Sequence, residues 1–125
     1  MEGLAGIHQL IGGLVVVAFI VVMVLAALQA AGRSGNATRT FSMVAAGLLV
    51  LQYVIGFILV GSGARNQVGH YIIALLILVP VALQHTVMKR FGPQTVGIAT
   101  LIWALAAVFL SIIAYLTGMH GAVAS

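Results

Sequence analysis

Long apolar stretches without a single Lys, Arg, Asp or Glu side chain constrain this chain more than any other feature. Short polar segments separate four such stretches, and an α-helix needs about 20 mostly apolar residues to cross a bilayer. The predicted spans cover residues 4–31, 41–61, 68–88 and 95–116. We therefore expect an all-α integral membrane protein, a single domain over residues 1–125 built as a four-transmembrane-helix up-down bundle.

The composition indicates that lipid is the solvent for most of the surface. Hydrophobic residues make up 63% of the chain and charged residues only 5%, and the mean hydropathy is +1.27. A soluble domain carries about a quarter charged residues. The formal net charge of +4 comes from few and dispersed basic residues, so we expect no binding to nucleic acid.

Few residues could support enzyme chemistry. Glu2 is the only carboxylate side chain, which excludes paired-carboxylate acid–base catalysis and a Ser-His-Asp triad. The chain has no cysteine, which excludes disulfides and thiolate metal sites. We expect no enzyme activity from this chain alone, although it would suit a non-catalytic subunit of a redox enzyme complex.

The basic residues predict the orientation of the bundle. Four of them fall in the first and third connections, and one falls in the second: Arg33, Arg39, Lys89 and Arg90 against Arg65. Cytoplasmic connections collect Lys and Arg. We therefore expect a multi-pass protein of the cell inner membrane with both termini on the outer, periplasmic side. Residues 1–7 contain no Lys or Arg, so we expect no cleaved signal peptide.

Short connections make successive helices antiparallel, so the first and third predicted helices run in the same direction. Pro80 lies inside the third, and we expect it to kink that helix.

Two histidines fall at matching depths of these parallel helices. His8 and His70 each lie just inside the outer start of a predicted span. Diagonal helices of a four-helix bundle lie about 14 Å apart, which leaves room for a haem iron between two inward imidazoles. Gly12, one turn after His8, and Gly56, in the outer half of the second span, would make space for a porphyrin. The pair therefore predicts the axial ligands of a haem b.

Other interpretations of these residues stay open. Histidines near the bilayer interface can be structural, and glycines in membrane helices often serve helix packing. Arg65 lies five residues before His70, and we expect it to contact the haem propionates or, alternatively, to be a solvated loop residue. Gln52 is expected to make an interhelical hydrogen bond.

The remaining histidines lack a partner at their depth. His85 lies about 22 Å further along the third helix than His70, so we expect an interfacial structural role, with a quinone or subunit contact as the alternative. His120 follows the fourth predicted helix. We expect an exposed tail residue or a propionate partner, with a copper or zinc site shared with the outer histidines as a further alternative.

Three segments together resemble one half of the haem A synthase family. They are IHQLIGGLVVV, LQYVIGFILV and GHYIIALLILVPVALQH, and the resemblance covers roughly residues 4–88. That family has two four-helix halves, each with a histidine at the outer start of two alternating helices that ligate a b-type haem. The resemblance implies these roles for His8 and His70. This chain has half the helices and lacks the family's acidic residue beside the ligand and its cysteine pair, so oxidation of a haem methyl group is not expected.

Three functions are compatible with these features of the sequence. The first is a haem b-binding membrane subunit that passes electrons or stabilises a respiratory or photosynthetic complex. Its partners would be other integral membrane subunits, lipid and, as a further candidate, a quinone. The second is a haem-free structural accessory subunit of such a complex. The third is a small transporter, which the absence of charged residues from the spans disfavours.

Overall fold

The computed structural model describes residues 2–66, 68–86 and 92–124, with the backbone alone for Glu2, residues 84–86 and residues 119–124. Those residues form helices joined by short connections, and no strand occurs among them. The helices are α1 (Glu2–Ala30), α2 (Asn36–Gly61), α3 (Val68–Leu76), α4 (Leu78–Thr86) and α5 (Pro93–Ala124). The expected all-α class is confirmed.

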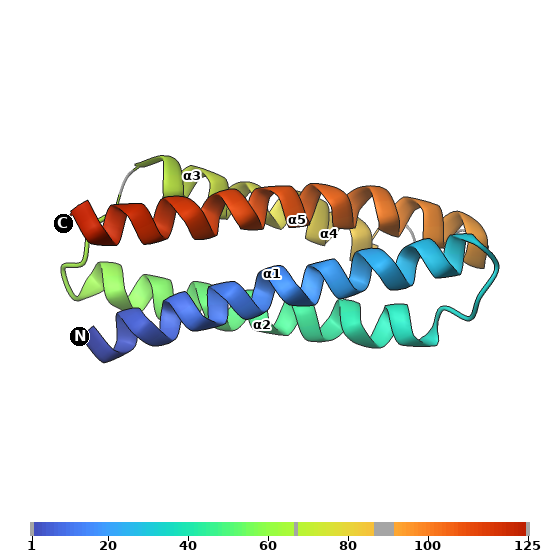
Figure 1. Ribbon diagram of the computed structural model, residues 1–125, viewed down its shortest axis with the longest axis horizontal. Helices are drawn as coiled ribbons and strands as arrows, with labels where there is room; N and C mark the ends of the chain where they lie inside the picture. The colour runs from blue at the N-terminus through green and yellow to red at the C-terminus, as the bar shows by residue number, and fades with distance from the viewer. Residues whose placement is uncertain (1, 67, 87–91, 125) are drawn as a thin grey trace.

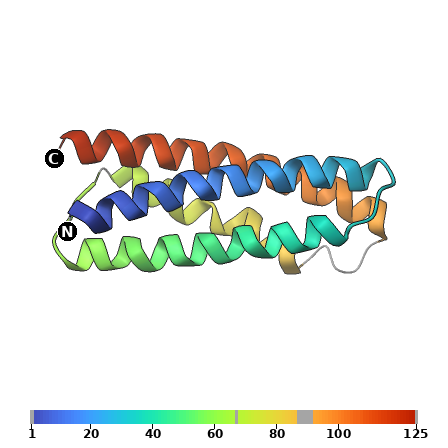
Figure 2. The same cartoon turned by 60° about the horizontal axis from the view of Figure 1, so that its bottom comes forward.

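The helices lie lengthwise against one another. Both chain ends and the α2–α3 connection lie at one end of the molecule, called here the terminal end (Figure 1). The α1–α2 connection lies at the opposite end. α1 packs extensively on both α2 and α5, whereas α3 and α4 pack on α5 (Figure 2). α5 therefore packs on α1 as well as on α3 and α4.

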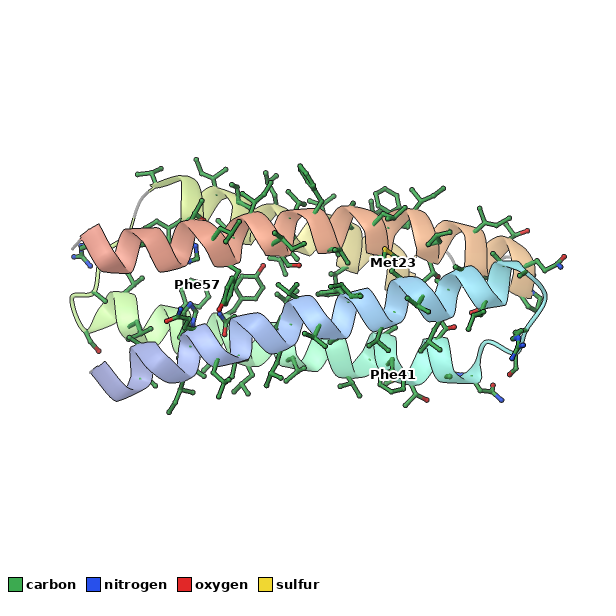
Figure 3. The ribbon with its side chains drawn as sticks, viewed as in Figure 1. Met23, Phe41 and Phe57 are labelled. Carbon is green, nitrogen blue, oxygen red and sulfur yellow. The ribbon has the colours of Figure 1, made fainter. Side chains whose placement is uncertain are left out.

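Three helices are long and apolar enough to cross a membrane, namely α1, α2 and α5. α3 and α4 belong to a shorter apolar stretch over residues 68–83. Large apolar side chains point outward along the bundle, among them Phe41 and Phe57 of α2, which are 42% and 67% exposed (Figure 3). An apolar outer face over long helices fits a chain embedded in lipid.

The third predicted span is divided in two. Residues 68–88 were expected to form one kinked helix, but α3 ends at Leu76 and α4 begins at Leu78. Pro80 lacks an N–H for the carbonyl of Leu76, and its ring crowds that carbonyl. Backbone bonds across the break persist, from Ile77 to Ile73 (3.2 Å) and from Val81 to Ile77 (3.4 Å). The break therefore lies where a proline disturbs a helix.

Two other boundaries differ from the prediction. α2 begins at Asn36 rather than at residue 41, and α5 covers Pro93–Ala124 rather than 95–116. The prediction followed apolar residues only, whereas helices continue past the hydrocarbon core with polar turns. Pro93 suits the first helical position because its missing N–H has no intrahelical partner there. His120 consequently lies within α5 and not in a tail.

Buried residues recur at alternating spacings of four and three along the helices and form the core. On α1 this repeat gives Val15, Phe19, Val22, Ala26 and Gln29, and on α5 it gives Thr100, Ala104, Ala107, Ser111 and Ala114. Spacing of this kind keeps one seam of each helix facing its neighbour. The α5 seam is made of small residues, so the helices approach closely. At Gly97 an added Cβ would lie 2.6 Å from the backbone nitrogen of Ala30.

Candidate functional site

Two histidines, His8 of α1 and His70 of α3, lie near the terminal end of the bundle. The buried line of α1 continues to His8, seven residues before Val15, and α3 begins two residues before His70. The two imidazole rings, one from α1 and one from α3, lie next to each other in an edge-on arrangement. Their centres are 6.5 Å apart and their planes meet at 76°. The structure therefore brings together the two side chains that the sequence placed at one depth.

His70 is held by α5. Its Nδ1 lies 2.9 Å from the carbonyl oxygen of Ala114 and 3.3 Å from Oγ1 of Thr117. Because a carbonyl oxygen only accepts, Nδ1 is the donor in this bond, and Nε2 is the remaining ring nitrogen. Within the part of the chain that the structure describes, nothing bonds to this Nε2. An added Cβ at Gly118 would lie 2.8 Å from Cε1 of His70, so the ring needs a glycine there.

In the part of the chain that the structure describes, His8 has one hydrogen-bond partner, Gln52 of α2. Nε2 of His8 lies 3.3 Å from Nε2 of the Gln52 amide. Nδ1 of His8 and Oε1 of Gln52 are both buried without a hydrogen-bond partner. Turning the amide over would let Oε1 accept from the ring, but Nδ1 would still have no partner. The predicted interhelical bond of Gln52 is present, and its partner is a candidate ligand.

The two predicted glycines make room for these polar side chains. An added Cβ at Gly56 would lie 3.1 Å from Cε1 of His8. One at Gly12 would lie 3.0 Å from the amide nitrogen of Gln52. Gly69, beside His70 in the sequence, has no such neighbour within 4 Å. Gly12 and Gly56 therefore belong to the site, whereas Gly69 does not crowd it.

Unpartnered polar atoms gather at this site. An unpaired buried donor or acceptor costs about 1–3 kcal/mol, so most such atoms are bonded. Among the described side chains, three buried atoms lack a partner: Nδ1 of His8, Oε1 of Gln52 and Oγ1 of Thr38. Two of the three lie in one contact pair, which is typical of a place where a further group binds.

Arg65 lies outside this contact network. Its guanidinium is exposed and donates to the carbonyl oxygens of Val60 (3.2 Å) and Ala64 (3.0 Å) at the end of α2. Its expected contact with haem propionates stays a prediction.

The sequence did not predict the hydrogen bonds of Asn66 beside His70. Asn66, in the α2–α3 connection, donates from Nδ2 to the carbonyl of Gly118 (3.1 Å), and its backbone N–H donates to the Tyr71 hydroxyl (2.8 Å). Thr117 was also missed. The one signal in the sequence is the buried repeat of α5, which reaches Gly118 seven residues after Ser111 and so places Thr117 and Gly118 near the seam.

The other candidate ligands cannot be placed with the pair. The backbone of His85 lies in α4 and that of His120 in α5, and their side chains lie outside the described residues. Lys89 and Arg90 also lie outside them. Where side chains are described, no three His, Cys, Asp or Glu residues gather as a metal-binding group. A metal held by His8 and His70 would need further ligands from elsewhere, as a porphyrin provides.

Comparison of the chain with models of known protein families, with curated proteins and with solved structures finds no match. The function must therefore be inferred from the chemistry of the histidine pair.

Proposed function

We propose that this chain is a haem b-binding membrane subunit in which His8 and His70 are the axial ligands of one low-spin haem. The observation that carries the proposal is the separation of the rings. Metal–imidazole bonds are about 2.0–2.1 Å long and a ring centre lies roughly 1.2 Å behind its nitrogen, so two imidazoles across one ion have centres about 6.4 Å apart. The observed separation is 6.5 Å.

The surrounding residues fit such a group. Nδ1 of His8 and Nε2 of His70 make no hydrogen bond to any described residue, so each ring keeps a nitrogen for a metal. Haem iron commonly takes axial histidines. α2 and α5 flank the pair, and each brings a glycine against one ring, Gly56 against His8 and Gly118 against His70. When bound, haem supplies an iron that accepts and gives up one electron.

The membrane placement follows the same proposal. α3, Ile77 and α4 together rise roughly 28 Å at about 1.5 Å per residue, which suffices for a fourth crossing of the hydrocarbon core. With the basic connections in the cytoplasm, both termini and the histidine pair lie toward the periplasmic side of the inner membrane. Arg65 lies on that side, within reach of the water interface, where it would pair with haem propionates.

The proposed role is electron transfer within, or stabilisation of, a respiratory or photosynthetic membrane complex. The resemblance of residues 4–88 to one half of the haem A synthase family supports haem binding but not haem oxidation. Other integral membrane subunits and lipid are the proposed partners, with a quinone as a further candidate. The short polar ends leave little surface for a soluble partner.

A haem-free accessory subunit is the second candidate. The bonds of His8 to Gln52 and of His70 to Ala114 join α1 to α2 and α3 to α5. Such a polar layer would fix the helices against one another without any cofactor.

An absorption spectrum separates the two candidates. The protein is expressed in a host supplied with a haem precursor and purified in mild detergent. We expect the reduced-minus-oxidised difference bands of a low-spin haem, one haem per chain, and a pyridine haemochrome of the b type. A folded protein with no haem absorption under these conditions would favour the accessory subunit.

A further inference from the structure

We propose that the two histidines are unequal ligands: His70 is permanent, whereas His8 exchanges for a small diatomic molecule that the amide of Gln52 then contacts. This inference rests on the proposed haem site and adds a ligand class to it. It follows from the different ways in which the two rings are held.

The ring of His70 is held at Nδ1 by two groups of α5. Nδ1 donates to the carbonyl of Ala114, and Thr117 Oγ1, which itself donates to that carbonyl (3.1 Å), lies beside it. A metal-bound histidine typically donates its second ring nitrogen to a backbone carbonyl or carboxylate, which fixes the tautomer and the ring plane. His70 already has this arrangement with Nε2 free.

The chain around His70 is tied down as well. Asn66 joins the α2–α3 connection to the carbonyl of Gly118 on α5 and to the hydroxyl of Tyr71 on α3. Displacing His70 from a metal would therefore strain bonds among three segments of the chain.

The ring of His8 lacks such support. Among the described residues its one hydrogen bond joins Nε2 to the amide of Gln52, a flexible side chain rather than a backbone carbonyl, and is 3.3 Å long, whereas Nδ1, the nitrogen left for a metal, has no partner. The start of α1 is also loosely packed. Gly3 and Gly6 each have open space where a Cβ would project, and Ile7 is exposed. Moving His8 away from a metal would break one bond and would disturb little of the bundle.

The side chain of Gln52 determines which kind of ligand could replace His8 at the metal. Its amide lies against His8, and both atoms of the amide group are inside the bundle, with Oε1 unpartnered. Glycines lie against both side chains, Gly12 next to the amide and Gly56 next to the imidazole. A site that offers one amide N–H and no charged side chain suits a small neutral ligand such as CO, NO or O₂.

The exchange involves no net redox change. His8 would give up its place with its electron pair still on the ring nitrogen, and a bound haem would accept the electron pair of the diatomic molecule instead. Gln52 is a positioning residue for His8 before the exchange and a hydrogen-bond donor afterwards.

The test compares variants of the haem-loaded protein in detergent, with CO as the probe. In the wild type, CO should bind the ferrous protein at a rate that saturates with CO concentration, because His8 must leave first. Gln52→Leu should raise the saturating rate roughly fivefold to tenfold, since it removes the one hydrogen bond that His8 makes to a described residue. It should also raise the C–O stretching frequency. Gln9→Leu, at an exposed neighbour of His8, is the matched control and should change neither.

Histidine replacements give the second comparison. His8→Gly should keep its haem in a high-spin, five-coordinate state that binds CO without saturation, and added imidazole should restore the low-spin spectrum. His70→Gly should lose most of its haem. Equal haem retention by the two variants, or a reduced wild type that never binds CO, would overturn the proposal.

A third measurement separates this inference from the proposed function. If the wild type takes up no haem, the proposed function fails, and the inequality is read from ¹⁵N shifts of the histidine rings in the protein without haem. Gln52→Leu should then shift the His8 signals and leave His70 protonated on Nδ1. A change in the ¹⁵N shifts of both histidines, or of neither, would contradict the proposal that the two rings are held unequally.

Discussion

At the scale of single residues, the site depends on two glycines that leave space for the histidine rings. Gly56 of α2 and Gly118 of α5 each abut one imidazole. Because the rings fill the space that a Cβ would take, the two glycines determine how far His8 and His70 can reach toward the bundle axis.

Gly118→Ala tests this dependence. The new Cβ would lie 2.8 Å from Cε1 of His70, so the ring must move and its bond to Ala114 must weaken. We expect a loss of about 1–3 kcal/mol in stability from overpacking, together with reduced haem occupancy. Thermal unfolding in detergent and haem absorbance per chain measure the two effects. Gly69→Ala is the control, since no neighbour lies within 4 Å of its Cβ position, and it should retain full occupancy.

The sequence was sufficient to pair His8 with His70, because depth follows from counting residues along parallel helices. It did not reveal the bonds that hold them. The partners of His70 come from Ala114 and Thr117, 44 and 47 residues away, and the rotation of α5 that presents them depends on packing. Gln52 was recognisable because a polar side chain in an apolar span needs a partner, although that partner could not be named.

At the scale of helices, hydropathy locates the long segments but not their breaks. Residues 72–83 are uniformly apolar, and only Pro80 marks the division between α3 and α4. At that break the hydroxyl of Tyr53 donates to the carbonyl of Ala74, which links α2 to α3. Tertiary contacts of this kind stabilise a disturbed helix inside a membrane, where no water is present to bond with the backbone.

Tyr53→Phe removes this donor and keeps the ring. We expect a loss of about 0.5–1.5 kcal/mol, the usual net value of one hydrogen bond. Tyr115→Phe is the matched control, because the ring of Tyr115 packs near Gly12 and Gly13 while its hydroxyl bonds to no described residue. Thermal unfolding of both variants in the same detergent gives the comparison. Equal melting temperatures for the two would contradict a stabilising role of the Tyr53 bond.

Gly97→Ala tests the close seam between α1 and α5. Its Cβ would lie 2.6 Å from the backbone nitrogen of Ala30 and 2.9 Å from the carbonyl carbon of Gln29. Backbone cannot move aside as a side chain can, so the helices must separate and the variant should lose about 1–3 kcal/mol or more. Gly47→Ala, in α2 with open space around it, should be neutral or slightly stabilising, since alanine is the better helix former. Unfolding temperatures that fall equally in both variants would contradict the close approach of the two helices.

At the scale of the whole molecule, the distribution of charge and the position of the histidines point to opposite ends. Among the described residues, Arg33 and Arg39 lie in or next to the α1–α2 connection, whereas the terminal end holds the histidine pair and Arg65. If the basic end lies in the cytoplasm, a haem at the terminal end would exchange electrons near the periplasmic face. The side of the membrane served by the proposed site therefore depends on the orientation.

Single cysteines test that orientation, because the chain contains none of its own. Ala31 and Ala64 lie in connections at opposite ends of the bundle, and both are exposed. In intact cells an impermeant thiol reagent that reaches the periplasm should label Ala64→Cys and should label Ala31→Cys only after the inner membrane is opened. The physical reason is the retention of Lys- and Arg-rich connections in the cytoplasm. The reverse labelling pattern would mean the opposite orientation, with the histidine pair near the cytoplasmic face. Equal labelling of both variants in intact cells would argue against a membrane-spanning orientation of α1 and α2.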